Sequence, residues 1–288
     1  MDKKLASIIK YFAVFEYFPS FEDVYTFFPE KISKKRLKMA FEAEKYTVGE
    51  YGIKQAQMSK LKTQISKKKL SNWKFRVYVK LISLFPQIKL IGLSGSIAMM
   101  NAKNEDDIDL FIITKKNRLF TARFLATIIA FIMGLKRPIG LKKASNKVCL
   151  NLFFDEDNLK VPKFKQTLFV GHEILQMKPI VNKDNVYERF LKANRWVQDI
   201  FPNSSWIMSK VKNQKSKIQV KSQNYFKNLK LLTLTSNFSL LTFNFIESIL
   251  KKFQLYLIRR HQTTEVITDT QLWFHPVDFG KKIKNYMI

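Results

Sequence analysis

Residues 90–114 read LIGLSGSIAMMNAKNEDDIDLFIIT, and this stretch decides the fold that we predict for the chain. Two apolar runs, each typical of a buried strand, are joined by a turn at Gly95 and Ser96 and by a polar loop. Side chains on a strand alternate between its two faces, so Asp107 and Asp109 are expected to point the same way. The stretch therefore predicts two neighbouring strands that carry a pair of carboxylates on one face.

The paired carboxylates and the turn have the chemistry of a metal and phosphate site. Mg²⁺ prefers oxygen ligands and is usually held by one or two carboxylates together with substrate phosphates. Gly95 lets the backbone turn tightly beside a ligand, and Ser96 would lie at a helix start, where phosphate binds well. We therefore expect Asp107 and Asp109 to bind Mg²⁺ or Mn²⁺, and Gly95 and Ser96 to contact a nucleotide. The alternative is an ordinary core hairpin with an acidic edge, although Asp is unfavourable inside strands.

These residues carry a resemblance to a known family. Gly95 and Ser96, ten intervening residues, and Asp107-x-Asp109 at the start of an apolar strand resemble the signature of the polymerase-beta-like nucleotidyltransferase superfamily. The resemblance implies an α/β (α+β) fold with a small mixed sheet over 88–154. It also implies that the Gly-Ser loop holds a nucleoside triphosphate, while the two Asp hold the metal that activates an acceptor hydroxyl and stabilises the leaving pyrophosphate.

The third strand, expected over 147–154, departs from the family pattern. The resemblance implies a third carboxylate on this strand, but the chain offers Asn151, and an amide cannot take up a proton at neutral pH. Asp155, at the end of the strand, is one substitute, and Glu173 is a more remote one. Residues 155–157 also fit a solvated acidic turn, so a catalytic chain and a silent relative both remain as alternatives.

Residues 1–69 are predicted to form an N-terminal domain with a basic linker. Apolar spacing predicts three helices, of which the second is capped by Ser20 with Asp23 three residues on, and the third is basic and follows Pro29. Residues 45–51 read as two short strands around a glycine. Three helices and a hairpin resemble a winged-helix domain, whose third helix enters a DNA groove. The alternative is a structural or protein-contact module.

Residues 70–160 are predicted to form the nucleotidyltransferase core, and 161–288 a helical C-terminal domain. The segment 210–230 is basic and rich in Ser, Gln and Asn, so we expect a mobile loop that an extended nucleic acid could contact. Helices are predicted over 118–135, 166–178, 184–201 and 240–260, and after Asp278.

Some side chains on these helices have two interpretations. Arg118 and Arg123 lie in the first turns of the 118–135 helix, where they could reach a triphosphate or extend to solvent, and we favour the second for Arg123. His172 and Glu173 are interpreted as an interior hydrogen-bonded pair rather than a catalytic one. The inward side of the 240–260 helix is predicted to consist of apolar residues at helical spacing, namely Phe243, Ile246, Leu250, Phe253 and Leu257.

The charge of the chain points to a polyanionic partner. Its 51 basic and 23 acidic residues give a formal net charge of +28. Residues 51–104 and 110–154 contain no Asp or Glu, so the acidic cluster at 105–109 is an island between basic stretches. Such a field attracts nucleic acid, although a lysine-rich surface favoured by an AT-rich genome is an alternative.

The remaining features narrow the class of protein. The single cysteine, Cys149, excludes an intramolecular disulfide and fits a reducing compartment, so we expect a cytoplasmic protein. Three scattered histidines give no zinc-site spacing. We expect no signal peptide, because Lys10 and Glu16 interrupt the first apolar segment and no cleavage site follows. We expect no transmembrane span, because the longest uncharged run, 231–246, is polar in places and too short.

The preferred prediction is a metal-dependent nucleotidyltransferase that moves NMP from an NTP to an acceptor hydroxyl. The charge favours RNA as the acceptor, with a tRNA 3′ end as one candidate. A second prediction is a catalytically silent nucleotidyltransferase-like module that binds nucleic acid within a larger assembly. A third is a toxin–antitoxin type enzyme that attaches a nucleotide to a protein hydroxyl.

Overall fold

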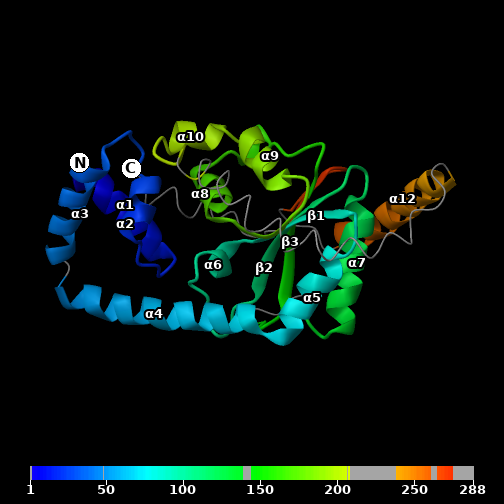
Figure 1. Ribbon diagram of the computed structural model, residues 1–288, viewed down its shortest axis with the longest axis horizontal. Coiled ribbons are helices and arrows are strands. Elements are labelled where there is room, and N and C mark those ends of the chain that lie inside the picture. The colour runs from blue at the N-terminus through cyan, green and yellow to red at the C-terminus, as the bar shows by residue number, and fades with distance from the viewer. Residues whose placement is uncertain are drawn as a thin grey trace.

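The fold is built around a mixed six-stranded sheet with helices on both of its faces (Figure 1). The computed structural model describes residues 2–47, 49–138, 144–205, 207, 238–260 and 265–274. The strands lie in the order β4-β1-β2-β3-β6-β5, and all neighbours are antiparallel except β2 and β3. Their bounds are β1 (Ile88–Leu93), β2 (Ile108–Thr114), β3 (Val148–Asp155), β4 (Lys178–Asn182), β5 (Val266–Ile267) and β6 (Gln271–Trp273).

The helices account for most of the other described residues. Their bounds are α1 (Asp2–Val14), α2 (Phe21–Thr26), α3 (Lys34–Thr47), α4 (Gly49–Ser71), α5 (Trp73–Ser83), α6 (Gly95–Ala98), α7 (Leu119–Ile132), α8 (Leu168–Gln176), α9 (Val186–Ala193), α10 (Trp196–Ile200) and α12 (Phe238–Arg259). The mixed α and β architecture that we predicted is therefore confirmed. The first three strands were predicted, whereas β4, β5 and β6 were not.

The two faces of β2 belong to two different hydrophobic cores. Ile108, Leu110 and Ile112 are buried among side chains of α5 and α7. Phe111 and Ile113 point the other way and are buried among side chains of α1, α8, α9 and α10. Because helices cover both faces, the strand is apolar almost throughout. An acidic residue on such a strand is therefore an exception that needs a functional or structural reason.

The N-terminal helices begin as predicted but do not end in a hairpin. Ser20 caps α2 through a capping box with Asp23, in which each side chain accepts a hydrogen bond from the other residue's backbone N–H. The predicted strands over 45–51 are wrong, because α3 continues to Thr47 and α4 starts at Gly49. A glycine can be accommodated in a helix at a cost of about 1 kcal/mol, so it did not force a turn. The β-hairpin that a winged-helix domain requires is therefore not formed by these residues.

The long helix α4 runs along one side of the molecule from α3 to α5 (Figure 1). The predicted domain boundary at residue 69 falls within the last turn of this helix. Buried side chains of α1 and α2, such as Phe12 and Val24, belong to the same hydrophobic cluster as those of α8 and α9. The N-terminal helices therefore share a core with the sheet.

The side of α12 that faces α7 contains both polar and apolar residues, so our prediction of an apolar inward side is confirmed only in part. Ile246, Phe253 and Leu257 are 42–51 % exposed, whereas Gln254 is buried. Glu247 accepts hydrogen bonds from backbone N–H groups in the first turn of α7, which have no partner within their own helix. Leu250 packs partly against the core as predicted, and the side chain of Phe243 lies outside the described residues.

Two other predictions, the 210–230 loop and the helix after Asp278, also lie outside the described residues. Within the part of the chain that the structure describes, every helix is too short or too polar to cross a lipid bilayer.

Candidate metal and phosphate site

The candidate site lies where β1, β2 and β3 begin or end on one face of the sheet. Asp107 directly precedes β2 and Asp109 is its second residue. Neighbouring backbones fix their position: the Ser94 N–H donates to the Asp109 carbonyl at 3.1 Å, and Asp109 is paired with Cys149 in the parallel ladder. The pleat turns both carboxylates toward the side on which α1 and α8 pack, as the alternation predicted.

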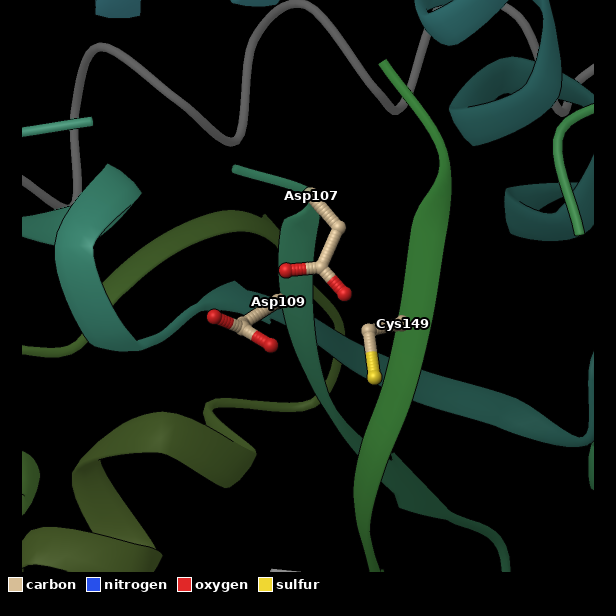
Figure 2. A group of neighbouring side chains, drawn as sticks. All are labelled: Asp107, Asp109 and Cys149. Atoms are coloured by element: carbon tan, nitrogen blue, oxygen red, sulfur yellow. The ribbon is translucent and has the colours of Figure 1, made fainter. Parts of the chain in front are cut away.

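Two carboxylates and one thiol converge at this point. Figure 2 shows that the side chains of Asp107, Asp109 and Cys149 project to the same side of the two strands. One ligand atom from each of the three lies within 4.8 Å of the others. We predicted the two Asp but not Cys149. The signal was present, because Cys149 is two residues before Asn151 and must share its face of the strand.

Asp109 lies in a crowded setting among polar and charged side chains. The Asn151 amide donates a hydrogen bond to its Oδ1 atom. The pKa of Asp109 is raised to about 8, mainly by burial and then by the nearby charges of Asp107 and Glu173, while Asn151 and Arg137 act in the opposite direction. A carboxylate held in such a place favours a cation as neighbour.

Arg137 is the cation that the structure places there. Its Nη1 atom is 2.6 Å from Asp107 Oδ2 and 3.8 Å from the sulfur of Cys149. Burial raises the pKa of the Cys149 thiol, and the charges of Asp109 and Asp107 raise it further. Arg137 was not predicted, because it is thirty positions from Asp107 in the sequence and lies in the segment after α7.

The glycine turn lies directly against the carboxylates. Gly95 has a φ of +59°, and a Cβ atom on it would be 2.7 Å from Asp109 Oδ2. Ser96 is the second residue of α6, and its hydroxyl donates to Asp106 Oδ2 at 3.1 Å. The turn and the acidic strand are therefore together, as predicted, and only a residue without a side chain fits between them. The hydroxyl of the neighbouring Ser94 is buried and has no hydrogen-bond partner in the part of the chain that the structure describes.

Of the two candidates for the third-strand position, Asn151 lies at the site and Asp155 does not. Asn151 contacts Asp109, so the third-strand position is at the site. Asp155 is not, and that candidate is wrong: it is paired with Thr114 at the other end of the ladder, six residues beyond Cys149. Its carboxylate instead accepts backbone hydrogen bonds from Asn117 and Asp157. At about 3.3 Å per residue the two ends of this ladder are roughly 20 Å apart.

Glu173 reaches the site from helix α8. It lines the same cavity as Asp107 and Asp109, and burial raises its pKa to about 7. Among the residues that the structure describes, no hydrogen bond or ion pair is found for its side chain. The predicted interior pair with His172 is not formed, because His172 turns away and stacks between Tyr11 and Phe27, with ring centroids at 4.1 and 3.9 Å.

The cavity around these groups has a volume of about 1020 Å³. Its lining combines the carboxylates and the glycine turn with apolar side chains of α7 and α12, among them Phe124 and Phe253. Arg123 is also part of this lining. It donates to Gln254 at 2.6 Å and its guanidinium stacks 4.8 Å from the ring centre of Phe274, while its buried Nε–H has no partner among the described residues.

Arg123 therefore faces the cavity rather than solvent, which corrects the interpretation that we favoured. Arg118 has a different place. Its Nη1 atom donates to the carbonyl of Asn117 and, at 2.8 Å, to Asn244 of α12, so it joins α7 to α12. Arg118 is not part of the cavity lining that the structure describes.

The donor set fits a divalent metal ion. Two carboxylates of one strand and a thiol of the next offer three ligand atoms on one side, and Gly95 lets the turn lie directly against Asp109, where a Cβ atom would not fit. Comparisons with protein-family models, with curated proteins and with solved structures found no match. A functional proposal therefore rests on the site alone.

Proposed function

We propose that this chain is a metal-dependent nucleotidyltransferase that transfers NMP from an NTP to an acceptor hydroxyl and releases pyrophosphate. The observation that supports it is the meeting of a paired-acid strand and a glycine turn in one cavity. Gly95 and Asp109 are so close that a methyl group would not fit between them. That arrangement brings a place for phosphate next to a place for a cation, which phosphoryl transfer requires.

The protein groups have separate tasks in this proposal. Asp107 and Asp109 would hold the metal ion, Mg²⁺ or Mn²⁺, and the turn at Gly95 and Ser96 would position the triphosphate. A bound divalent ion supplies the positive charge that stabilises the attacking and leaving oxygens. Arg123 lines the cavity, its Nε–H has no partner among the described residues, and it would add a donor for the substrate. Positioning and charge then account for most of the rate enhancement.

The acceptor hydroxyl must lose a proton when it attacks the α-phosphorus. Asn151 cannot accept it. Glu173 lines the same cavity, has no partner among the described residues and has a pKa raised to about 7. A base is most effective when its pKa lies near the working pH. We therefore assign the proton to Glu173, which would take the place of the carboxylate that the third strand lacks.

RNA is the acceptor class that the charge favours. A net charge of +28 gives a strong attraction for polyanions at low salt. Exposed lysines such as Lys67 and Lys68 of α4 contribute to this charge on the described surface. This argument concerns the acceptor alone, so another hydroxyl acceptor would leave the assignment of the metal and phosphate groups unchanged.

The test is transfer of label from each α-³²P-labelled NTP to pooled RNA with Mg²⁺ or Mn²⁺. Transfer by the unmodified chain and its loss in Asp107→Ala plus Asp109→Ala are expected. Asp155→Asn is the matched control, because Asp155 is a buried acid on the same sheet that lies outside the cavity lining. It is expected to keep the activity. Loss of transfer in the control, or retention in the double variant, would contradict the proposal.

A silent module is the competing function, and one observation favours it. Asp107 is paired with Arg137 and Asp109 accepts from Asn151, so both carboxylates have protein partners without a metal ion. In that case no NTP would be transferred to any acceptor, and salt-sensitive RNA binding would be the same in the double Asp variant and in the unmodified chain. Binding alone does not separate the two functions, since both depend on phosphate contacts.

A further inference from the structure

The third ligand position beside the two carboxylates is occupied by sulfur. In the register of the parallel ladder, Cys149 is the residue directly opposite Asp109. Its Sγ atom and one oxygen from each of Asp107 and Asp109 lie within 4.8 Å of one another (Figure 2). Ligand atoms that share one tetrahedral ion at 2.0–2.3 Å lie roughly 3.3–3.8 Å from one another, so side-chain rotations that close the set by about 1 Å would complete it.

Two further observations concern the surroundings of these three groups. The guanidinium of Arg137 contacts both Asp107 and the sulfur of Cys149, so the point already attracts a cation. Ser94, which is 4 % exposed, follows Leu93 in an extended conformation and therefore shares the face of Asp109. Its hydroxyl has no hydrogen-bond partner among the residues that the structure describes, and buried polar groups in native proteins are nearly always paired.

We propose that Asp107, Asp109 and Cys149 form a site for a thiophilic divalent cation of the zinc class, which they bind more tightly than Mg²⁺. Three protein ligands with an open fourth position are the arrangement of catalytic zinc sites, and both carboxylate and thiolate are zinc ligands. Mg²⁺ gains little from sulfur, because it prefers oxygen. On coordination the thiol proton is released to solvent. The inference rests on the proposed function, since it concerns the same pair of carboxylates.

The chain offers a clean test, because Cys149 is its single cysteine. The full-length protein is freed of metal with a chelator and titrated with Cd²⁺, and the sulfur-to-metal charge-transfer absorption in the ultraviolet is recorded. We expect a band that saturates at one Cd²⁺ per chain and persists in excess Mg²⁺. Added Zn²⁺ should remove the band, because it displaces Cd²⁺ from the same ligands. Cys149→Ser should show no band.

A bare thiol could also bind cadmium, so the carboxylates need their own variant. Asp107→Asn plus Asp109→Asn should keep the sulfur but weaken Cd²⁺ binding by at least roughly tenfold, because even groups one shell beyond the ligands change metal affinity by 10–100-fold. Thermal unfolding of each variant without metal checks that it is folded. An absent band in the unmodified chain, displacement by Mg²⁺, or an unchanged Cd²⁺ midpoint in the double variant would overturn the inference.

The two proposals can fail separately. A cadmium band with no nucleotide transfer leaves the metal site standing and removes the enzyme. Transfer with Mg²⁺ that is unchanged in Cys149→Ser, together with no cadmium band, leaves the enzyme standing and removes the sulfur ligand. Cys149→Asp adds a positive arm, since a third carboxylate should shift the preference from Cd²⁺ toward Mg²⁺.

Discussion

Replacing Gly95 with alanine tests the contact on which the candidate site depends. Gly95 has a φ of +59°, and the new Cβ atom would be 2.7 Å from Asp109 Oδ2. Real Cβ atoms do not approach oxygen so closely, so either the turn or the carboxylate has to move. Asp109 cannot move freely, because it is only partly exposed and accepts a hydrogen bond from Asn151.

Two costs add in this variant. The left-handed backbone conformation costs an alanine about 1–2 kcal/mol relative to its preferred region. Displacing the Asp109 carboxylate from its amide donor costs roughly 1–3 kcal/mol more, because a buried polar group is left unsatisfied. We therefore expect Gly95→Ala to lower the free energy of unfolding by roughly 2–5 kcal/mol in total. NTP transfer should fall with it, since the turn and the metal ligands would move apart.

Gly134 provides the matched control. It follows the C-cap of α7 and has a φ of +66°, and a Cβ atom on it would meet nothing within 4 Å. Gly134→Ala therefore carries the backbone cost but not the collision. Urea unfolding of both variants, with and without metal, gives the difference that belongs to Asp109 alone. Equal destabilisation by the two substitutions, or full transfer activity in Gly95→Ala, would refute the close approach of the turn to the carboxylate.

Three further predictions concern the neighbourhood of the site. The pKa of Asp109 is raised from 3.8 to about 8, mainly by burial, so the folded protein loses stability as the pH rises through this window and the carboxyl group has to deprotonate. Asp109→Asn should therefore stabilise the metal-free protein at pH 8 by roughly 2–5 kcal/mol in denaturant unfolding. A smaller gain at pH 8 than at pH 4 would contradict this. Glu247→Ala should cost about 1–2 kcal/mol, because the N–H groups of Phe120 and Thr121 lose their acceptor, and Glu247→Gln should cost less. Asn151→Asp should lower the thermal stability of the metal-free protein by placing a second carboxylate against Asp109, and added Mn²⁺ should restore it; a variant indifferent to Mn²⁺ would place residue 151 outside the site.

Local patterns were sufficient for the first half of the core. The strand over 88–93, the glycine turn and the strand with Asp109 are encoded by alternation and by a residue type that tolerates a positive φ. The capping box at Ser20 is likewise a contact between residues three positions apart. Features of this kind follow from neighbours in the chain, so they can be read without the fold.

Local patterns failed where distant segments decided the outcome. The hairpin predicted over 45–51 is helical, because glycine permits a turn without requiring one. The inward side of α12 carries Glu247 among its apolar residues, because the first turn of α7 needs an acceptor and Glu247 supplies it. No periodicity within α12 contains that information.

The sequence by itself determined that this protein has two carboxylates on one face of a strand beside a glycine turn. Only the tertiary structure decided what surrounds them: Cys149 from the parallel strand, Arg137 from the segment after α7, and Glu173 from α8. The physical reason is that alternation along a strand is a property of adjacent residues. The partners of a buried charge, in contrast, come from whichever segments the packing of both sheet faces brings to it.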